Sequence, residues 1–366
     1  MKAKIFIVVG GTGGHIYPGI ALAQELKKRS SDFEPVFVTD GRPLAGKIIG
    51  SGNYGMRKIS SSPFPRRKFW NICCFLFKTF IGFCESVFLI KKAKPSAVVA
   101  FGAYISVPVV LACALMKVPV ILHEQNYYPG MANRFLSFCS EKVALTFKES
   151  ARYFPPEKTV ITGNPVREKI LTVSPGHGLS KFGLDKGRAT ILVFGGSQGA
   201  QEINHAVCGV LPYLEGIKKR IQFLHICGNR DTRPIENKYR ASGIKARVYK
   251  YIEDMHYAYS CADVIICRAG ATTISEVVAK AIPAIFIPYS YAASGHQALN
   301  LKPLADKGAC LVIESGALSE ESLAIKLVPL IKKAGKRNQI KKNLEEMSAH
   351  FSNAASKLCD LLEEYV

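Results

Sequence analysis

Two segments, half a chain apart, each join an apolar run to a glycine-rich loop. In the first, Lys4–Val9 leads into GGTGGH at 10–15, and in the second, Thr190–Phe194 leads into GGSQG at 195–199. A β-branched run that breaks into glycines and continues as a helix is typical of the strand–turn–helix unit that opens a nucleotide-binding half. Glycines let the backbone approach a phosphate, and a helix start offers unpaired N–H groups. The two loops therefore predict two similar domains that bind phosphate.

Strand-length apolar runs alternate with helix-length segments through both halves of the chain. This alternation predicts βαβ units, and hence parallel sheets covered by helices on both faces. With 366 residues, each of two domains can bury its own core. We expect an N-terminal domain over residues 1–163 and a C-terminal domain over 164–349, divided at the GNP sequence of 163–165. The looser stretch 172–183 is an alternative place for the division.

The charge balance favours an anionic partner. Lys and Arg number 49 against 28 Asp and Glu, a formal charge of +21. A phosphorylated small molecule or an acidic membrane surface suits this charge, although a generally basic soluble protein would also have it. We expect no nucleic-acid partner, because zinc-finger spacing, RNA-binding aromatic motifs and basic arms are all missing.

The cysteines and acidic residues do not form metal-binding patterns. Eleven cysteines occur without a C-x-x-C pair, which indicates neither a disulfide framework nor a zinc site and fits a reducing cytoplasm. No D-x-D pair or other cluster has metal-ligand spacing. We therefore expect no metal and no cofactor.

The segment Phe69–Ile90 is rich in aromatic residues and lies between basic residues at 66–68 and 91–92. Three interpretations remain open: a buried crossover helix, a contact with an anionic membrane surface, and a transmembrane span. Aromatic residues between basic flanks suit an interfacial site. A span is disfavoured because Lys78 and Glu85 would each cost about 2–3 kcal/mol in the bilayer core. Core packing and membrane contact can coexist on different faces.

Polar residues follow the carboxyl ends of the predicted strands, which is where open α/β sheets bind their ligands. His15 follows the first glycine loop at a helix start, where it could act as a base, bind an anion or only cap the loop. Ile16 replaces the third glycine of the dinucleotide fingerprint, which disfavours an NAD enzyme. HEQN at 123–126 follows the run Val120–Leu122, and Arg167 could clamp a phosphate.

The second half has two further candidate segments. Residues 268–276 follow an apolar run and can present N–H and O–H donors to a phosphate, while Glu276 could accept hydrogen bonds from ribose hydroxyls or belong to a capping box. Gln297 and Asn300 lie one turn apart on a predicted helix and could bind sugar hydroxyls.

In this order, the motifs resemble those of the MurG family, the undecaprenyldiphospho-muramoylpentapeptide N-acetylglucosaminyltransferases. The resemblance spans nearly the whole chain and rests on GGTGGH, HEQN, GNPVR at 163–167, GGSQGA at 195–200, the 268–276 pattern and the Gln297/Asn300 helix. It implies the GT-B fold: two Rossmann-like, doubly wound parallel-sheet domains facing a deep cleft, with the last helix, about 350–366, packing back on the first domain.

The resemblance also implies an activity. Family members transfer GlcNAc from UDP-GlcNAc to the muramyl 4-hydroxyl of lipid I with inversion, giving lipid II for peptidoglycan synthesis. They are peripheral enzymes of the cytoplasmic face of the inner membrane, and Phe69–Ile90 sits where the family contacts the membrane. Alternatives are another GT-B enzyme, such as a lipid glycosyltransferase or a UDP-GlcNAc 2-epimerase, and a non-catalytic membrane-surface protein that binds nucleotide sugars.

Two sets of site residues are implied in the same way. His15 is the first candidate for the catalytic base and Glu124 the second. The donor-binding residues would be Thr12, Gly13, Gly14, Asn126, Arg167, Ser197, Ile252, Ala271, Thr272, Thr273, Ile274, Ser275, Glu276 and Gln297. The sequence departs from the family at Ser294-Gly295, where relatives commonly have acidic or charged residues, which leaves contacts at that point open.

Overall fold

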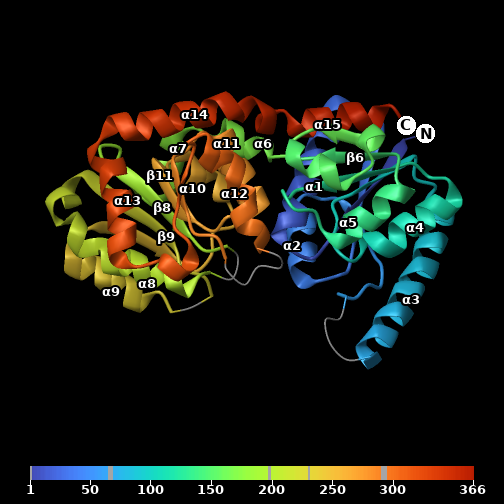
Figure 1. Ribbon diagram of the computed structural model, residues 1–366, viewed down its shortest axis with the longest axis horizontal. Helices are drawn as coiled ribbons and strands as arrows, with labels where there is room; N and C mark the ends of the chain where they lie inside the picture. Colours follow the sequence, from blue (N-terminus) through green and yellow to red (C-terminus); the bar gives the residue numbers. More distant parts are fainter. Residues whose placement is uncertain (1, 65–68, 197–198, 230, 290–294) are drawn as a thin grey trace. The chain divides into compact units, whose positions relative to one another are not determined.

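The computed structural model describes residues 2–64, 69–196, 199–229, 231–289 and 295–366 (Figure 1). The chain forms two compact units: residues 1–167 with 350–366 make the N-terminal unit, and residues 168–349 make the C-terminal unit. The division lies after Arg167, where the sequence placed it after residue 163. The physical reason is that Val166 is buried and the Arg167 guanidinium lies over the Tyr17 ring in the first unit.

The N-terminal unit contains a seven-stranded parallel sheet in the order β3-β2-β1-β4-β5-β6-β7. The chain winds outward from β1 to β3 and then returns to place β4 on the other side of β1. In sheets of this kind, ligands usually bind at the carboxyl ends of the two strands between which the order reverses, here β1 and β4. The strands are β1 Ala3–Val9, β2 Phe33–Thr39, β3 Gly55–Lys58, β4 Ala97–Ala100, β5 Val120–Glu124, β6 Lys142–Leu145 and β7 Thr159–Ile161.

Helices cover both faces of this sheet, and each face has its own apolar core. One core joins the sheet to α1, α2 and α15, and the other joins it to the C-terminal part of α3, to α4 and to α5. The near-continuous apolar runs of β1 and β4 fit a sheet that is buried on both sides. The helices are α1 Gly13–Arg29, α2 Pro43–Ser51, α3 Phe69–Ala93, α4 Ser106–Met116, α5 Met131–Leu136 and α15 Ala354–Glu363.

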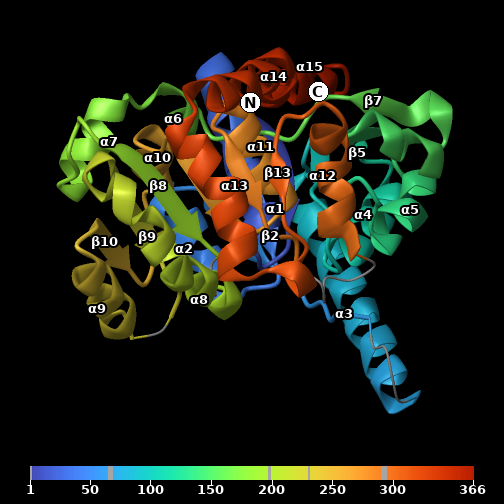
Figure 2. The same ribbon diagram turned by 60° about the vertical axis from the view of Figure 1, so that its left-hand side comes forward.

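Helix α3 packs against the unit by one face of its C-terminal half. Near its C-terminal end, Ser86 and Ile90 are buried, and Glu85 accepts hydrogen bonds from the backbone N (2.6 Å) and Oγ (3.0 Å) of Ser60. Its N-terminal part, which carries Phe77 and Phe80, extends beyond the rest of the unit with these rings exposed (Figure 1 and Figure 2). By length and composition, Ile72–Ala93 is the one helix in the described parts of the chain that is apolar enough to cross a membrane. The helix is thus a buried crossover only in part.

The C-terminal unit repeats the same winding in a six-stranded parallel sheet, ordered β10-β9-β8-β11-β12-β13. Here the reversal falls between β8 and β11. The prediction of two doubly wound α/β domains is therefore confirmed. The strands are β8 Ala189–Phe194, β9 Ile221–Ile226, β10 Lys245–Tyr249, β11 Val264–Cys267, β12 Ala284–Phe286 and β13 Leu311–Val312. The helices are α6 Glu168–Thr172, α7 Pro175–Phe182, α8 Gln201–Val210, α9 Arg233–Ser242, α10 Met255–Ser260, α11 Ala271–Ala279, α12 His296–Asp306, α13 Glu320–Lys332 and α14 Ala334–Ser352, whose last residues, from 350 on, belong to the N-terminal unit.

Candidate functional site

The first glycine loop joins β1 to α1 and places His15 in the first turn of the helix. The loop lies against the residues that follow β4, because a Cβ on Gly10 would come within 2.5 Å of the Ala103 Cβ. The His15 ring is half-buried, and its Nδ1 lies 2.9 Å from Thr12 Oγ1. Burial lowers the pKa of His15 to about 4, against a smaller opposing effect of the Asp40 carboxylate. The ring is therefore neutral at pH 7, and when Nδ1–H donates to Thr12, Nε2 carries the free lone pair.

Glu124 is buried at the end of β5, and both of its carboxylate oxygens accept hydrogen bonds from the chain that follows. Oε1 accepts from the backbone N (2.9 Å) and Nδ2 (3.1 Å) of Asn126, and Oε2 accepts from Gly130 N (3.1 Å) and Asn133 Nδ2 (2.9 Å). Burial raises the pKa of this carboxyl, and the four hydrogen bonds oppose the rise. The carboxylate therefore fixes the loop from Asn126 to the start of α5.

His123 links the end of β5 to the GNPVR segment. It is fully buried, its ring lies 5.0 Å from the Phe101 ring, and its Nε2 is 2.9 Å from the Gly163 carbonyl oxygen. Burial lowers the pKa of His123 to about 4, so that the ring is neutral and can donate one hydrogen bond to that carbonyl. Two residues after the GNP turn, the Arg167 guanidinium lies 4.0 Å from the centre of the Tyr17 ring on α1. The GGTGGH, HEQN and GNPVR motifs therefore meet at the carboxyl ends of the strands of the N-terminal sheet.

In the C-terminal unit, the second glycine loop joins β8 to α8. Ser197 lies outside the described residues. Gly199 has a φ of +74°, and a Cβ there would lie 2.5 Å from the Cys227 carbonyl oxygen. Gly195 is similarly constrained, because its Cβ would lie 2.3 Å from the Ala200 nitrogen. Glycine is needed at both positions because the loop passes close to its own start and to the end of β9.

The 268–276 segment forms the turn from β11 into α11. Gly270 is the N-cap and has no side chain, so α11 has no capping box and the capping alternative for Glu276 is wrong. Thr272 and Thr273 are half-buried in the first turn, whereas Glu276 is buried one turn further along. The remaining predicted residues here, Ala271, Ile274 and Ser275, are buried and support the helix start.

The other two predicted donor residues of this unit also lie beyond strand ends. Ile252 is buried shortly after β10. Gln297 is in the first turn of α12, and its Oε1 accepts a hydrogen bond of 2.9 Å from the Tyr289 backbone N. The residues predicted around β11 and β12 therefore lie at the carboxyl ends of the strands of the C-terminal sheet.

Sequence reasoning did not predict the ion pair at these strand ends. Arg268 Nη1 lies 2.5 Å from Glu202 Oε1 and donates to Ser315 Oγ (3.0 Å) and to the Ile287 carbonyl oxygen (3.3 Å). Its guanidinium also lies 5.1 Å from the centre of the Tyr289 ring. Arg268 thus connects the first turn of α8 with the segments after β11, β12 and β13. No local spacing in the sequence indicates these pairings.

Both halves of the chain match models of one family. The model described as glycosyltransferase family 28 N-terminal domain matches residues 5–145, and the model described as glycosyltransferase family 28 C-terminal domain matches residues 190–358. In the described parts of the chain, no three His, Cys, Asp or Glu side chains gather as metal ligands.

Similar proteins align over almost the full length. The chain is 41% identical over 343 residues to a protein of Halothermothrix orenii, covering 91% of each. It is 39% identical over 362 residues to one of Thermodesulfovibrio yellowstonii, covering 98% of each. Both are named UDP-N-acetylglucosamine–N-acetylmuramyl-(pentapeptide) pyrophosphoryl-undecaprenol N-acetylglucosamine transferase.

Solved structures show the same architecture. Acinetobacter baumannii MurG superimposes with a TM-score of 0.76 at 27% identity, covering 99% of each chain. A UDP-GlcNAc 2-epimerase from Neisseria meningitidis gives a TM-score of 0.71 at 14% identity, covering 99% of this chain and all of the other, a likeness of fold alone.

Proposed function

The chain belongs to glycosyltransferase family 28, and we propose that it transfers GlcNAc from UDP-GlcNAc to the muramyl 4-hydroxyl of lipid I, giving lipid II for peptidoglycan. The observation that carries this proposal is the near-full-length identity of 41% and 39% to proteins named for this transfer. The fold alone would not select the reaction, because the epimerase has it as well.

We assign the donor mainly to the C-terminal unit. The backbone N–H groups at the start of α11 and the hydroxyls of Thr272 and Thr273 are suited to the diphosphate. Glu276 would accept hydrogen bonds from the ribose, Gln297 would contact the sugar, and the Ile252 backbone would contact the uracil. Ser197, Thr12, Gly13, Gly14, Asn126 and Arg167 complete the proposed set of donor-binding residues.

His15 is the proposed catalytic base. Its neutral ring and the placement of Thr12 on Nδ1 support a role in which Nε2 takes the proton of the 4-hydroxyl. The acceptor oxygen then forms a bond to the anomeric carbon as the bond to the UDP oxygen breaks, which inverts that centre. The N-terminus of α11 would stabilise the negative charge that develops on UDP.

Glu124, the second candidate for the base, is better suited to positioning. Its two oxygens already accept four hydrogen bonds, two of them from Asn126, so the carboxylate holds a proposed donor-binding residue in place. We therefore assign Glu124 to the orientation of the loop at 125–130, and His15 to proton transfer.

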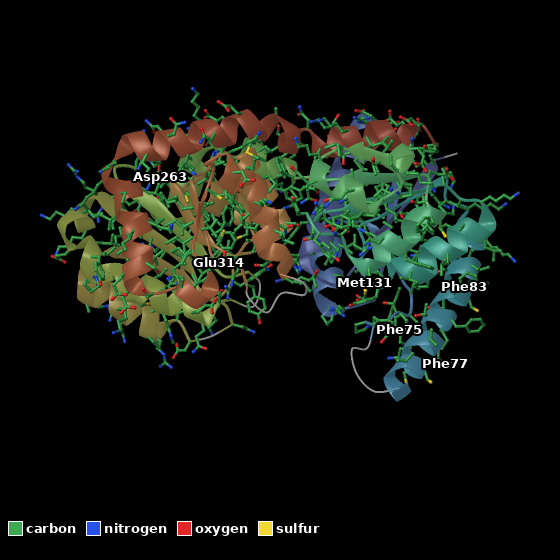
Figure 3. All side chains as sticks on the ribbon, viewed as in Figure 1. Phe75, Phe77, Phe83, Met131, Asp263 and Glu314 are labelled. Carbon is green, nitrogen blue, oxygen red and sulfur yellow. The ribbon has the colours of Figure 1, made fainter. Side chains whose placement is uncertain are left out.

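We infer from α3 that the protein contacts an anionic membrane surface. Its exposed aromatic rings, together with basic residues at both ends of the segment, suit the headgroup region of an anionic bilayer. In Figure 3, Phe75 and Phe77 lie on the extending part of α3, and Phe83 lies nearer the sheet. We propose that the enzyme is peripheral and works at the cytoplasmic face of the membrane, where lipid I is available.

The deciding experiment is an assay of the purified protein with UDP-GlcNAc and a lipid I analogue. We expect a disaccharide lipid product and release of UDP, both dependent on the acceptor. Conversion of UDP-GlcNAc alone to its 2-epimer would identify an epimerase. UDP affinity without turnover of either kind would identify a binding protein.

A further inference from the structure

The surface of α5 carries an apolar stripe that the proposed function has not used. Helix α5 continues into a turn of 3-10 helix at Ser137–Cys139, and Met131, Phe135 and Phe138 are spaced four and three residues apart along it. This spacing places them on one face. Their side chains are 69%, 58% and 74% exposed, while Leu136 on the opposite face is buried. Large apolar residues gathered in this way mark an interaction site.

The stripe lines a groove with cationic groups at its edge. Met131, Phe135 and Phe138 form a groove of about 300 Å³ together with Arg134 and Tyr153. The guanidinium groups of Arg152 and Arg134 lie 4.8 and 5.7 Å from the centre of the Tyr153 ring. An apolar floor with guanidinium groups beside it suits an amphiphile that has an anionic group next to a hydrocarbon chain.

The groove begins where the loop of the candidate site ends. Glu124 accepts hydrogen bonds from Gly130 N and from Asn133 Nδ2 on α5, so the start of the stripe is fixed to the carboxyl end of β5. Met131 is the next residue after Gly130, and Figure 3 shows it at the start of α5. An acceptor with its head beside this loop would have its chain close to the stripe.

We propose that the groove of Met131, Phe135 and Phe138 binds the first isoprene units of the acceptor's polyprenyl chain. The inference rests on the proposed function, since it concerns the same acceptor. Between the site and the bilayer, the first units of the chain would otherwise be exposed to water, and the stripe offers them an apolar surface. Arg134 and Arg152, beside the Tyr153 ring, would offer guanidinium groups to the anionic pyrophosphate end of that chain.

The test compares two acceptors that share one headgroup, one with a long polyprenyl chain and one with a chain too short to reach past Met131. Both are assayed as dispersed molecules without vesicles. For Phe135→Ser and Phe138→Ser, we expect the KM for the long-chain acceptor to rise roughly tenfold. The KM for the short-chain acceptor, the KM for UDP-GlcNAc and kcat should not change. Phe135→Leu should restore most of the affinity.

Leu115→Ser is the matched control, because Leu115 is an exposed apolar residue of α4 in the same unit. An equal rise in KM for both acceptors would mean a structural role and overturn the proposal. The proposal would also be overturned if the Phe135→Ser and Phe138→Ser variants kept the wild-type KM for the long-chain acceptor, with or without a changed oligomeric state. An equal rise of this KM in Leu115→Ser would overturn it as well. If the wild-type protein converts neither acceptor, the proposed function fails together with this inference. If it converts both and the variants match it, only this inference fails.

Discussion

At the scale of single residues, His15 is the group on which the proposed chemistry depends. We expect His15→Ala to lower kcat by about 10²–10⁴ while leaving UDP affinity nearly unchanged, because the ring is assigned to proton transfer. Turnover measured at saturating donor, together with the thermal shift caused by UDP, checks both parts. Wild-type turnover would remove His15 from the role.

Glu124→Gln is the contrasting variant. The amide keeps the size of the side chain but places an NH₂ group where one oxygen now faces two donors, which should loosen the Asn126 loop. We expect a higher KM for UDP-GlcNAc, with the pH dependence of kcat kept. Loss of the basic group from the pH profile in this variant would instead make Glu124 the base.

Two fully buried histidines make stability depend on pH. Burial lowers the pKa of His123 to about 4 and that of His225 to about 3. Between pH 6.5 and about 4 the unfolded chain binds protons at these positions and the folded chain does not, so stability falls as the pH falls. Each histidine contributes a slope of up to about 1.4 kcal/mol per pH unit in this window.

The His225 contribution can be isolated in the C-terminal unit. His225 lies 3.0 Å from both the Tyr239 hydroxyl and Asn204 Oδ1. Urea unfolding at pH 7 and pH 5 should show a smaller pH dependence for His225→Gln than for the wild type. Tyr239→Phe removes a partner but keeps the ring, so it should destabilise at both pH values with the slope preserved. An unchanged slope in His225→Gln would contradict the assignment.

At the scale of elements, the attachment of α3 depends on one glycine. A Cβ on Gly82 would lie 2.0 Å from the Ser60 carbonyl oxygen, on the same segment that Glu85 binds. We expect Gly82→Ala to lower the free energy of unfolding by roughly 1–3 kcal/mol. Gly46→Ala on α2 is the control: nothing lies within 4 Å of its Cβ, and it should stabilise by about 0.5–1 kcal/mol. Equal effects of the two would rule out the steric explanation.

The same helix makes a prediction about membranes. Phe77→Ser combined with Phe80→Ser should weaken co-sedimentation with phosphatidylglycerol–phosphatidylethanolamine vesicles about tenfold or more, because two exposed rings are lost from α3. Ile325→Ser on α13 removes a comparably exposed apolar side chain from the other unit and should have no effect. Undiminished vesicle binding by the double variant would exclude α3 as the contact.

At the scale of the whole molecule, the last residues complete the first unit. Leu358, Leu361 and Leu362 of α15 belong to the core that contains α1, and Arg29 pairs with Asp360 (2.7 Å) and Glu363 (3.0 Å). We expect Leu358→Ala to cost about 2–5 kcal/mol. Hydrogen exchange should increase in α1 and β1 and stay unchanged in β8 and α8. Increased exchange confined to the C-terminal unit would contradict this assignment of α15.

The sequence by itself determined the two sheets and the motifs at their edges. β-Branched runs, glycine turns and helix-length spacing are local signals, so Lys4–Val9 and Thr190–Phe194 were recognised as strands without any knowledge of their neighbours. The family followed from the order of the motifs along the chain. Each of these signals lies within a few consecutive residues, so it can be recognised without knowledge of any tertiary contact.

Only the tertiary structure decided which side chains contact one another at the carboxyl ends of the two sheets. The four donors on Glu124, the pairing of Arg268 with Glu202 and the exposure of one end of α3 depend on how the elements pack. Composition could not separate a buried crossover from an exposed helix, because apolar side chains suit both protein cores and membranes. The groove of Met131, Phe135 and Phe138 likewise came from packing, since burying the opposite face of α5 is what leaves this one uncovered.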